Sequence, residues 1–175
     1  GFQIDISKGH SNWLIEGELI RSIHKPTAIY VNEIVWPLHE KTSNDLLSTA
    51  KCSTPQDCNK KTKSSVLCQS CNSWLKELEA LHEKGKNPSW HKNCNCAKWS
   101  EDHWEMAKFF MPPLGSNLST VKDAESTDIS SLLNVLEWLR FPGKTPENVD
   151  LVRKLRSEVR NTWAHAPQQE MSDDK

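Results

Sequence analysis

The sequence predicts an all-α fold, a helical bundle of about five or six helices interrupted by a cysteine-rich insertion. Apolar residues recur at helical spacing in several segments, and no segment shows the alternation of a half-buried strand. All six cysteines lie between residues 52 and 96, so both long flanks lack them. We therefore expect one domain over residues 1–166, with an insertion at about residues 48–99 and a polar tail at residues 167–175.

The first part of the chain carries two helical patterns separated by a proline. Ser11 is placed to cap a helix that runs to about Ile23, and Pro26 is expected to end it. A second pattern covers about residues 27–47, with a kink expected at Pro37. Residues 48–65 have no apolar periodicity, so we expect a polar loop there.

The middle of the chain predicts two more helices and a linker. Apolar residues at helical spacing after the second pair of cysteines indicate a helix that ends near Gly85. Ser100, followed by two acidic residues, marks the start of another helix, which Pro112 closes. Residues 114–127 are rich in serine, and we expect a linker there.

Two helices with clear caps complete the pattern. Asp128 is expected to cap a helix that Pro142-Gly143 ends. Pro146 is suited to the first turn of the last helix, and Pro167 is expected to stop it. Large apolar residues on the inner faces should form the core, among them Trp13, Trp104, Leu136, Leu155 and Trp163.

The cysteine spacing is typical of a zinc site. Cys68-x2-Cys71 is the strongest half-site, because this spacing lets two thiolates converge on one tetrahedral ion at the start of a helix. Loop closure favours Cys52 and Cys58 as the other half, with Cys94 as the alternative ligand. A structural zinc site takes four ligands, so at least one thiol is expected to be a bystander, and Cys96 is our choice. Disulfides or free thiols are the competing interpretations.

The last helical pattern ends in Arg160, Asn161 and, four residues further on, His165. Arginine holds phosphate bidentately and histidine moves protons near neutral pH, so this trio suits phosphate chemistry. Arg153, Lys154 and Arg156 precede it and would guide a phosphate backbone, although a solvated basic face is the commoner explanation for such a run. A basic helix end that merely complements the helix dipole is the competing interpretation of the trio itself.

Composition argues against some classes of protein, namely those that bind nucleic acid through bulk charge, span a membrane or are secreted. The formal net charge is −1, which argues against binding nucleic acid through bulk charge, although a local basic face is compatible with it. No apolar run approaches the length of a membrane span, and the N-terminus carries no secretory signal pattern. We expect a soluble intracellular protein, cytoplasmic or nuclear, and, because residue 1 is Gly rather than Met, a part of a longer chain.

An ordered string of tryptophans and cysteines resembles the family named after human chromosome X open reading frame thirty-eight. The string ends in Phe110-Met111-Pro112, and the likeness extends upstream to Cys52 and downstream to His165. The spacing around His91 departs from the family pattern by one residue, so His91 is not assigned as a ligand. The residues that carry the resemblance are Cys68, Cys71, Trp74, Asn93, Cys94, Trp99, Trp104, Glu105, Ala107 and Lys108.

That family in turn resembles HEPN domains, the higher eukaryotes and prokaryotes nucleotide-binding superfamily. The resemblance implies an HEPN-like helical bundle whose last helix carries an Arg, a polar residue and a His, the pattern that Arg160, Asn161 and His165 match. It also implies a homodimer and a metal-independent endoribonuclease that acts on RNA with these three catalytic residues. Many such domains are degenerate, so the alternative is a non-catalytic, zinc-stabilised module for protein interaction or dimerisation.

Overall fold

The computed structural model describes residues 8–47, 51–58 and 66–169, with side chains from residue 17 to residue 159 within these ranges. Among them the fold is all-α, as predicted, with six α-helices and no strand. The α-helices are α1 (Lys8–Leu46), α2 (Pro55–Cys58), α3 (Gln69–Leu81), α4 (His103–Ala107), α5 (Ile129–Trp138) and α6 (Pro146–Gln169). Four short 3₁₀ turns join them: η2 (Trp90–Lys92), η3 (Cys96–Lys98), η4 (Lys108–Phe110) and η5 (Gly115–Ser119).

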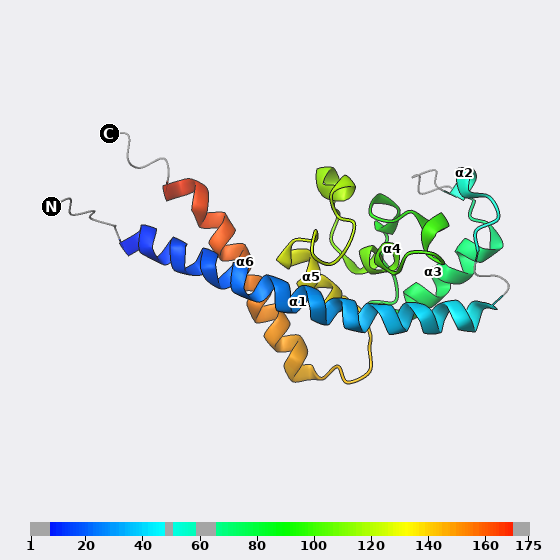
Figure 1. The fold of residues 1–175 in the computed structure, drawn as a ribbon, viewed down its shortest axis with the longest axis horizontal. Helices are drawn as coiled ribbons and strands as arrows, with labels where there is room; N and C mark the ends of the chain where they lie inside the picture. Colours follow the sequence, from blue (N-terminus) through cyan, green and yellow to red (C-terminus); the bar gives the residue numbers. More distant parts are fainter. Residues whose placement is uncertain (1–7, 48–50, 59–65, 170–175) are drawn as a thin grey trace.

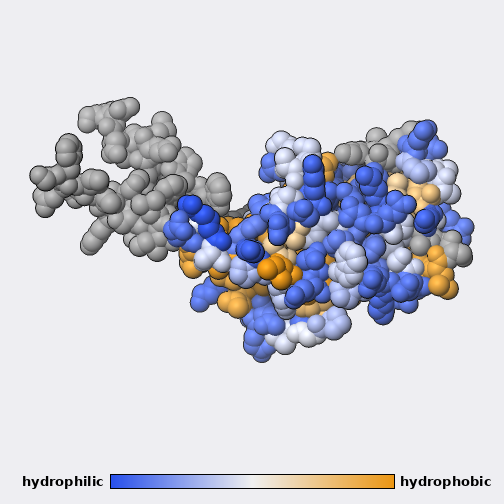
Figure 2. Space-filling view, in the orientation of Figure 1, coloured by the Kyte–Doolittle hydropathy of each residue, from blue (hydrophilic) through white to orange (hydrophobic). Residues whose placement is uncertain are grey.

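Helix α1 runs along the whole molecule and contacts α3, α4, α5 and α6 (Figure 1). Helix α6 crosses the part of α1 that is nearer to its N-terminal end, whereas α2 and α3 lie at the C-terminal end of α1. No helix among the described residues has both the length and the apolar character that a membrane span requires. The surface seen in Figure 2 is mostly hydrophilic, with small separate hydrophobic patches.

The prediction that Pro26 ends the first helix is wrong, because α1 continues for 39 residues through both prolines. Pro26 and Pro37 are exposed, so the carbonyl groups that lose a backbone donor lie on the solvent side. The inner face of the same stretch carries Val31 and Val35, both fully buried. An interior proline costs about 3 kcal/mol, and burying each valine returns roughly 1.5 to 3 kcal/mol. Packing therefore outweighs the local preference.

Residues 114–127 are not the exposed linker that their composition predicts, since Leu114, Val121, Ala124 and Thr127 are buried. Thr127 explains why this segment is anchored. Its hydroxyl accepts a bond from Trp104 Nε1 at 3.1 Å and donates to the Asp123 carbonyl at 2.6 Å. Its own carbonyl lies 2.7 Å from Nε2 of His24 on α1. The segment thus links α1 to α4.

The predicted helix ends are confirmed only in part, since α1 already begins at Lys8, before the expected cap Ser11, and α3 ends at Leu81, before Gly85. Asp128 accepts a hydrogen bond from the Ser131 amide and caps α5, and Gly143 takes the left-handed conformation (φ 80°) in the turn beyond this helix. Helix α4 begins after Asp102 rather than Ser100, since Asp102 accepts from the Trp104 amide. Helix α6 continues to Gln169, so the predicted stop at Pro167 is wrong.

The ends of α3 and α5 meet through an antiparallel bridge between His82 and Leu139. Two cations serve both helix ends. Lys144 Nζ donates to the carbonyls of Glu137 and Leu139 at 2.7 and 2.9 Å, and it forms an ion pair with Glu83 at 2.9 Å. Arg140 also pairs with Glu83 and donates to the carbonyls of Ala80 and Glu83. These contacts satisfy carbonyls that lack partners at helix C-termini.

The core is a cluster built around large aromatic side chains. Trp104 and Leu136 are buried in it, as predicted, while Leu155 is only partly buried. Trp13 and Trp163 lie outside the described side chains, so their predicted burial stays a prediction. The largest fully buried side chains also include Trp74, Trp99, Phe109 and Phe110.

Candidate metal centre

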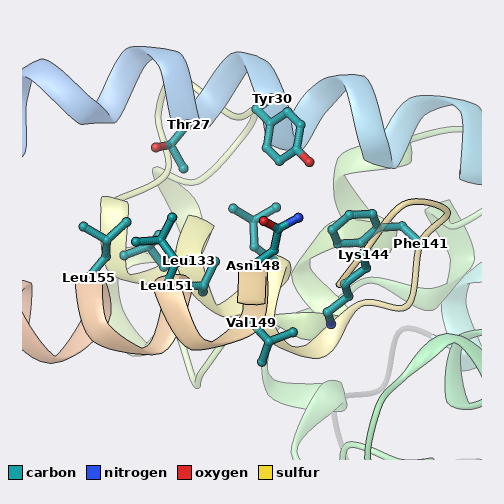
Figure 3. Close-up of a pocket in the computed structure, with 11 residues that line it drawn as sticks. Thr27, Tyr30, Leu133, Phe141, Lys144, Asn148, Val149, Leu151 and Leu155 are labelled. Carbon is teal, nitrogen blue, oxygen red and sulfur yellow. The ribbon is translucent and has the colours of Figure 1, made fainter. Parts of the chain in front are cut away.

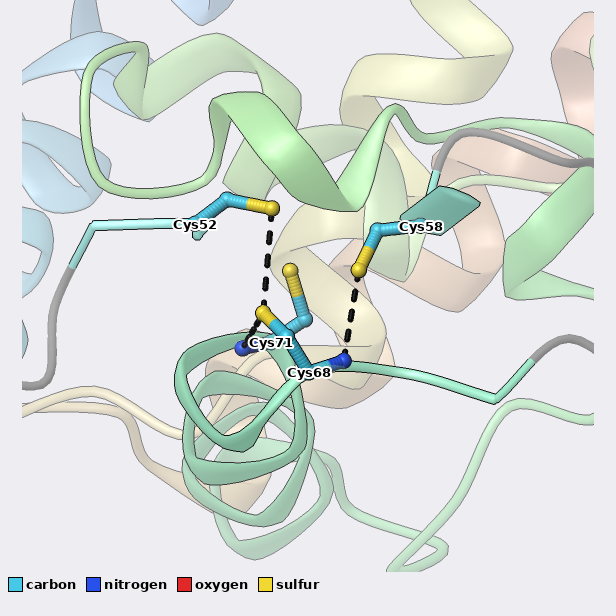
Figure 4. A group of neighbouring side chains, drawn as sticks. All are labelled: Cys52, Cys58, Cys68 and Cys71. Carbon is cyan, nitrogen blue, oxygen red and sulfur yellow. Dashed lines mark hydrogen bonds between the residues drawn. The ribbon is translucent and has the colours of Figure 1, made fainter. Parts of the chain in front are cut away.

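Four cysteines converge where α2 meets the start of α3. The sulfur atoms of Cys52, Cys58, Cys68 and Cys71 all lie within 4.8 Å of one another (Figure 4). Cys52 precedes α2 and Cys58 is its last residue, whereas Cys68 is the N-cap of α3 and Cys71 lies in its first turn. These are the four residues that the spacing predicted. The structure therefore brings the two half-sites together.

The distances fit a tetrahedral metal site better than disulfides. Sγ of Cys68 lies 3.7 Å from Sγ of Cys52. A tetrahedron with zinc–sulfur distances of about 2.3 Å has sulfur–sulfur edges of about 3.8 Å, whereas a disulfide needs about 2.05 Å. All six cysteines are described, and all are free thiols. The donor set and its spacing therefore fit a structural zinc ion.

Backbone amides point at the sulfur atoms, as expected for thiolate ligands. The amide of Cys68 donates to Sγ of Cys58 at 3.3 Å, and the amide of Cys71 donates to Sγ of Cys68 at 3.5 Å. Burial raises the pKa of Cys68, but hydrogen bonds from the amides of Cys71 and Ser53 outweigh it and lower this pKa to about 5. The start of α3 is also the positive end of a helix dipole. Cys68 is therefore prepared to bind as a thiolate.

The thiols of Cys52 and Cys71 need a cation before they can ionise. Burial raises the pKa of Cys52 to about 11, and contact with the Cys96 thiol, followed by burial, raises the pKa of Cys71. A coordinated thiol is deprotonated by the charge of the metal ion. Four sulfur atoms at this spacing are therefore stable together as ligands of a divalent cation, and not as four free thiolates.

Cys94 and Cys96 lie outside the group of four, so the structure does not support Cys94 as the alternative ligand. Cys96 contacts the backbone of one of the four cysteines, since its thiol donates to the Cys58 carbonyl at 3.0 Å. Cys94 is buried, and burial together with the charge of Glu105 raises its pKa. Spacing could not have assigned Cys96 this position, because it depends on how the η3 turn packs against α2.

The end of the molecule that carries the four cysteines is tied to α1 through aromatic rings. Trp74 of α3 is buried and stacks on His39 of α1, with ring centroids 5.5 Å apart. Nε2 of His39 lies 2.8 Å from the carbonyl of Trp99, which is itself fully buried. The Cys94–Cys96 loop is fixed by Glu105, which accepts from the Asn95 amide at 2.7 Å and from Lys108 at 2.6 Å. The sulfur cluster thus sits on a rigid support.

The second predicted site lies in the last helix, at the other end of the molecule. Arg160, Asn161 and His165 fall within α6, which is continuous through them. Their side chains lie outside the described part of the chain, so their assignment as catalytic residues stays a prediction. The structure does locate two of the basic residues that precede them.

Arg153 and Arg156 are engaged in binding α5. Glu137 of α5 is buried, and its carboxylate pairs with Arg153 at 3.2 Å and with Arg156 at closer range. Arg156 also donates to the side-chain oxygen of Asn134. The proposed role of these two arginines as guides for a phosphate backbone is therefore not supported. The carboxylate of Glu137 that binds them could not be recognised from the sequence.

A groove of about 280 Å³ lies between α1, α5 and α6 (Figure 3). Its walls are mainly apolar and include Leu133, Val149 and Leu155. Tyr30 and Leu151, which also line the groove, are about half exposed. The groove offers an apolar surface near the end of the molecule where α6 crosses α1.

The fold and the sulfur cluster together define an all-α domain with a four-cysteine candidate metal centre. The chain belongs to the family described as "Domain of unknown function (DUF4559)", whose model matches residues 6–175. It is 31% identical over 93 residues to "Uncharacterized protein CXorf38 homolog" from Mus musculus. The match covers 53% of this chain and 28% of the mouse protein, and it supports the family resemblance drawn from the sequence. No solved structure matches the chain.

Proposed function

We propose that Cys52, Cys58, Cys68 and Cys71 hold a structural Zn²⁺ ion that orders the insertion against α1. The 3.7 Å sulfur–sulfur distance and the amides directed at the sulfur atoms support this proposal. A site with four protein ligands is closed, so the ion would supply folding free energy rather than activate a water molecule. Structural zinc is worth about 10 kcal/mol or more in zinc-finger peptides.

Elemental analysis of protein purified without an affinity tag tests this site. We expect about one zinc per chain, in line with the single four-thiol cluster. Cys71→Ser should lose the metal, whereas Cys94→Ser, the control that leaves the four ligands intact, should keep it. A metal content near zero, or equal zinc in both variants, would refute the assignment.

We further propose that this domain is HEPN-like and binds RNA, with Arg160, Asn161 and His165 acting on the phosphate backbone. The continuity of α6 supports this proposal, because it holds Asn161 and His165 one helical turn apart on one face. His165 would accept the proton of a 2′-hydroxyl, whose oxygen attacks the adjacent phosphorus, and Arg160 would stabilise the charge on the phosphate. The P–O5′ bond breaks and the leaving oxygen takes a proton. The products are a 2′,3′-cyclic phosphate and a 5′-hydroxyl.

Incubation with a mixed-sequence single-stranded RNA tests the catalytic proposal. His165→Ala should reduce cleavage by about 10²- to 10⁴-fold, which is the usual value of one proton transfer. Arg160→Ala should weaken both turnover and RNA binding, and Lys76→Ala, which removes an exposed lysine of α3, serves as the control. Chelators should not inhibit cleavage while the zinc site stays folded. Intact RNA with the wild-type protein would remove the enzyme proposal for this domain.

The apolar groove between α1, α5 and α6 favours a second candidate function, a zinc-stabilised dimerisation module without catalysis. Its occupant would be a second copy of this chain, seated on the surface that exposes Tyr30 and Leu151. Tyr30→Glu should then give a monomer in sedimentation, with RNA binding absent in both forms. In this case His165→Ala would only loosen the helix end, by a few tenths to about 1 kcal/mol.

A further inference from the structure

A second hollow, of about 220 Å³, lies beside the bridge between the ends of α3 and α5. Its lining contains two lysines and no acidic residue. Aromatic, Met and Pro side chains supply the apolar part of its wall. The lining includes His82, Lys84, Lys86, Phe110, Asn134 and Trp138.

Two side chains of the lining, His82 and Asn134, are little exposed and carry hydrogen-bond donors without a partner among the described residues. His82 is only 5% exposed, and its Nδ1 accepts the backbone amide of Lys84 at 3.1 Å, so the ring hydrogen is on Nε2. No described residue accepts a bond from this Nε2. The side-chain oxygen of Asn134 accepts from Arg156, which leaves its amide NH₂ group without a described acceptor. Among the described residues only Nε1 of Trp99 is a buried side-chain donor without a partner, so the donors of His82 and Asn134 reach solvent, and a ligand in the hollow can replace that solvent.

The charges around the hollow are positive and uncompensated. Lys84 Nζ is held 4.1 Å from the centre of the Trp138 ring. Neither Lys84 nor Lys86 forms an ion pair with any residue that the structure describes, and the neighbouring Glu83 is taken by Arg140 and Lys144. The hollow therefore offers cations and N–H donors to one ligand.

Three backbone carbonyl groups in or next to the lining already have partners. Nδ2 of Asn93 donates to the carbonyls of Met111 and Pro112 at 3.1 and 2.9 Å, and Nδ2 of Asn87 donates to the carbonyl of Phe109 at 2.7 Å. The donors on these three carbonyl oxygens offset part of the negative charge that would repel an anion. The site thus favours an anion over a cation or a neutral hydrogen-bond donor.

We propose that this hollow binds an organic phosphate monoester, with the phosphate at Lys84, Lys86 and Nε2 of His82 and the attached organic group against Phe110 and Trp138. Phosphate provides several acceptor oxygens for these convergent donors, and the apolar wall provides affinity for the attached group. The source of the phosphate is a free mononucleotide or the 5′ end of an RNA chain, since both carry the same group. This inference goes beyond the proposed function, because it does not depend on Arg160 or His165.

Isothermal titration calorimetry with AMP tests the proposal on the whole chain. We expect saturable binding of AMP, none of adenosine, and weaker binding of inorganic phosphate. The double variant Lys84→Ala, Lys86→Ala should lose at least about tenfold in affinity. The matched control Lys76→Ala, Lys122→Ala removes two exposed lysines from other surfaces and should stay within about twofold.

A second variant tests the site without the risk that the protein fails to fold. Asn134→Asp is nearly isosteric and keeps an acceptor for Arg156, but it adds a negative charge to the lining, so it should weaken AMP binding with no loss of helical signal. Competition with AMP by a 5′-phosphorylated oligoribonucleotide supports the site with an RNA end as its ligand, and failure to compete supports it with a free mononucleotide. No saturable AMP binding up to about 5 mM, equal affinity in the lysine double variant, or equal affinity for inorganic phosphate and AMP would overturn the proposal.

Discussion

Glu137 fixes α6 against α5 through two arginines, and its removal is the sharpest test of this packing. Its carboxylate is 4% exposed and pairs with Arg153 and Arg156. Glu137→Gln keeps the shape of the side chain and one acceptor oxygen but removes the charge. Glu137→Ala removes the acceptor as well.

The expected loss in the free energy of unfolding depends on how exposed Arg153 and Arg156 are. Removing one partner of a fully buried ion pair costs about 3 to 5 kcal/mol, because the other charge stays buried. Here the side chain of Arg153 is 56% exposed and that of Arg156 is 24% exposed, so both guanidinium groups can turn to water. We therefore expect Glu137→Gln to lower the free energy of unfolding by about 1 to 2 kcal/mol, and Glu137→Ala by about 2 to 4 kcal/mol.

Urea unfolding followed by circular dichroism measures this change. With a slope of roughly 2 kcal/mol per molar urea, Glu137→Gln should lower the midpoint by about 0.5 to 1 M. Glu101→Gln, which changes an exposed carboxylate, is the control and should shift the midpoint by under about 0.2 M. A double-mutant cycle with Arg156→Met should give a coupling energy above about 0.5 kcal/mol. Equal midpoints for Glu137→Gln and the control would refute the reasoning.

Two further predictions concern the core and its histidine. Burial, followed by the charge of Lys84, lowers the pKa of His82 in the folded state. The unfolded state therefore binds a proton first as the pH falls below about 6.5. Above that pH, neutral His82 contributes its full share to the free energy of unfolding. This contribution is lost as the pH falls toward the lower pKa that His82 has in the folded state. The urea midpoint of His82→Gln should fall less between pH 7.5 and 5 than that of His91→Gln, and parallel curves would contradict the assignment. Trp104→Ala should cost about 3 to 5 kcal/mol in urea unfolding, since Trp104 is 1% exposed. The control Trp36→Ala, at a side chain 48% exposed, should cost much less, and similar losses would mean that Trp104 is not a core residue.

Features that depend on local chemistry could be predicted from the sequence. The Asp128 cap follows from one side chain accepting an amide within the next turn, and Cys68-x2-Cys71 follows from the pitch of a helix start. The pairing of this motif with Cys52 and Cys58 could also be predicted, because loop closure favours near neighbours.

Features that depend on distant packing could not be predicted. A proline such as Pro26 disfavours the interior of a helix in any sequence. Here the burial of Val31 and Val35 against other helices outweighs this preference. The apparent linker at residues 114–127 is anchored by Thr127, whose partners lie on α1 and α4. His82 and Asn134 line one hollow because the ends of α3 and α5 are brought together by a bridge between residues far apart in the sequence.

The uninterrupted course of α1 sets the smallest fragment of this protein that can fold. A fragment that begins after Leu46 would keep all six cysteines but would lose Ala28, Val31 and Val35 from the core. It would also lose His39, against which Trp74 stacks. The cysteine-rich region is therefore not an autonomous zinc finger that can be excised, and limited proteolysis within α1 should release insoluble pieces rather than two stable halves.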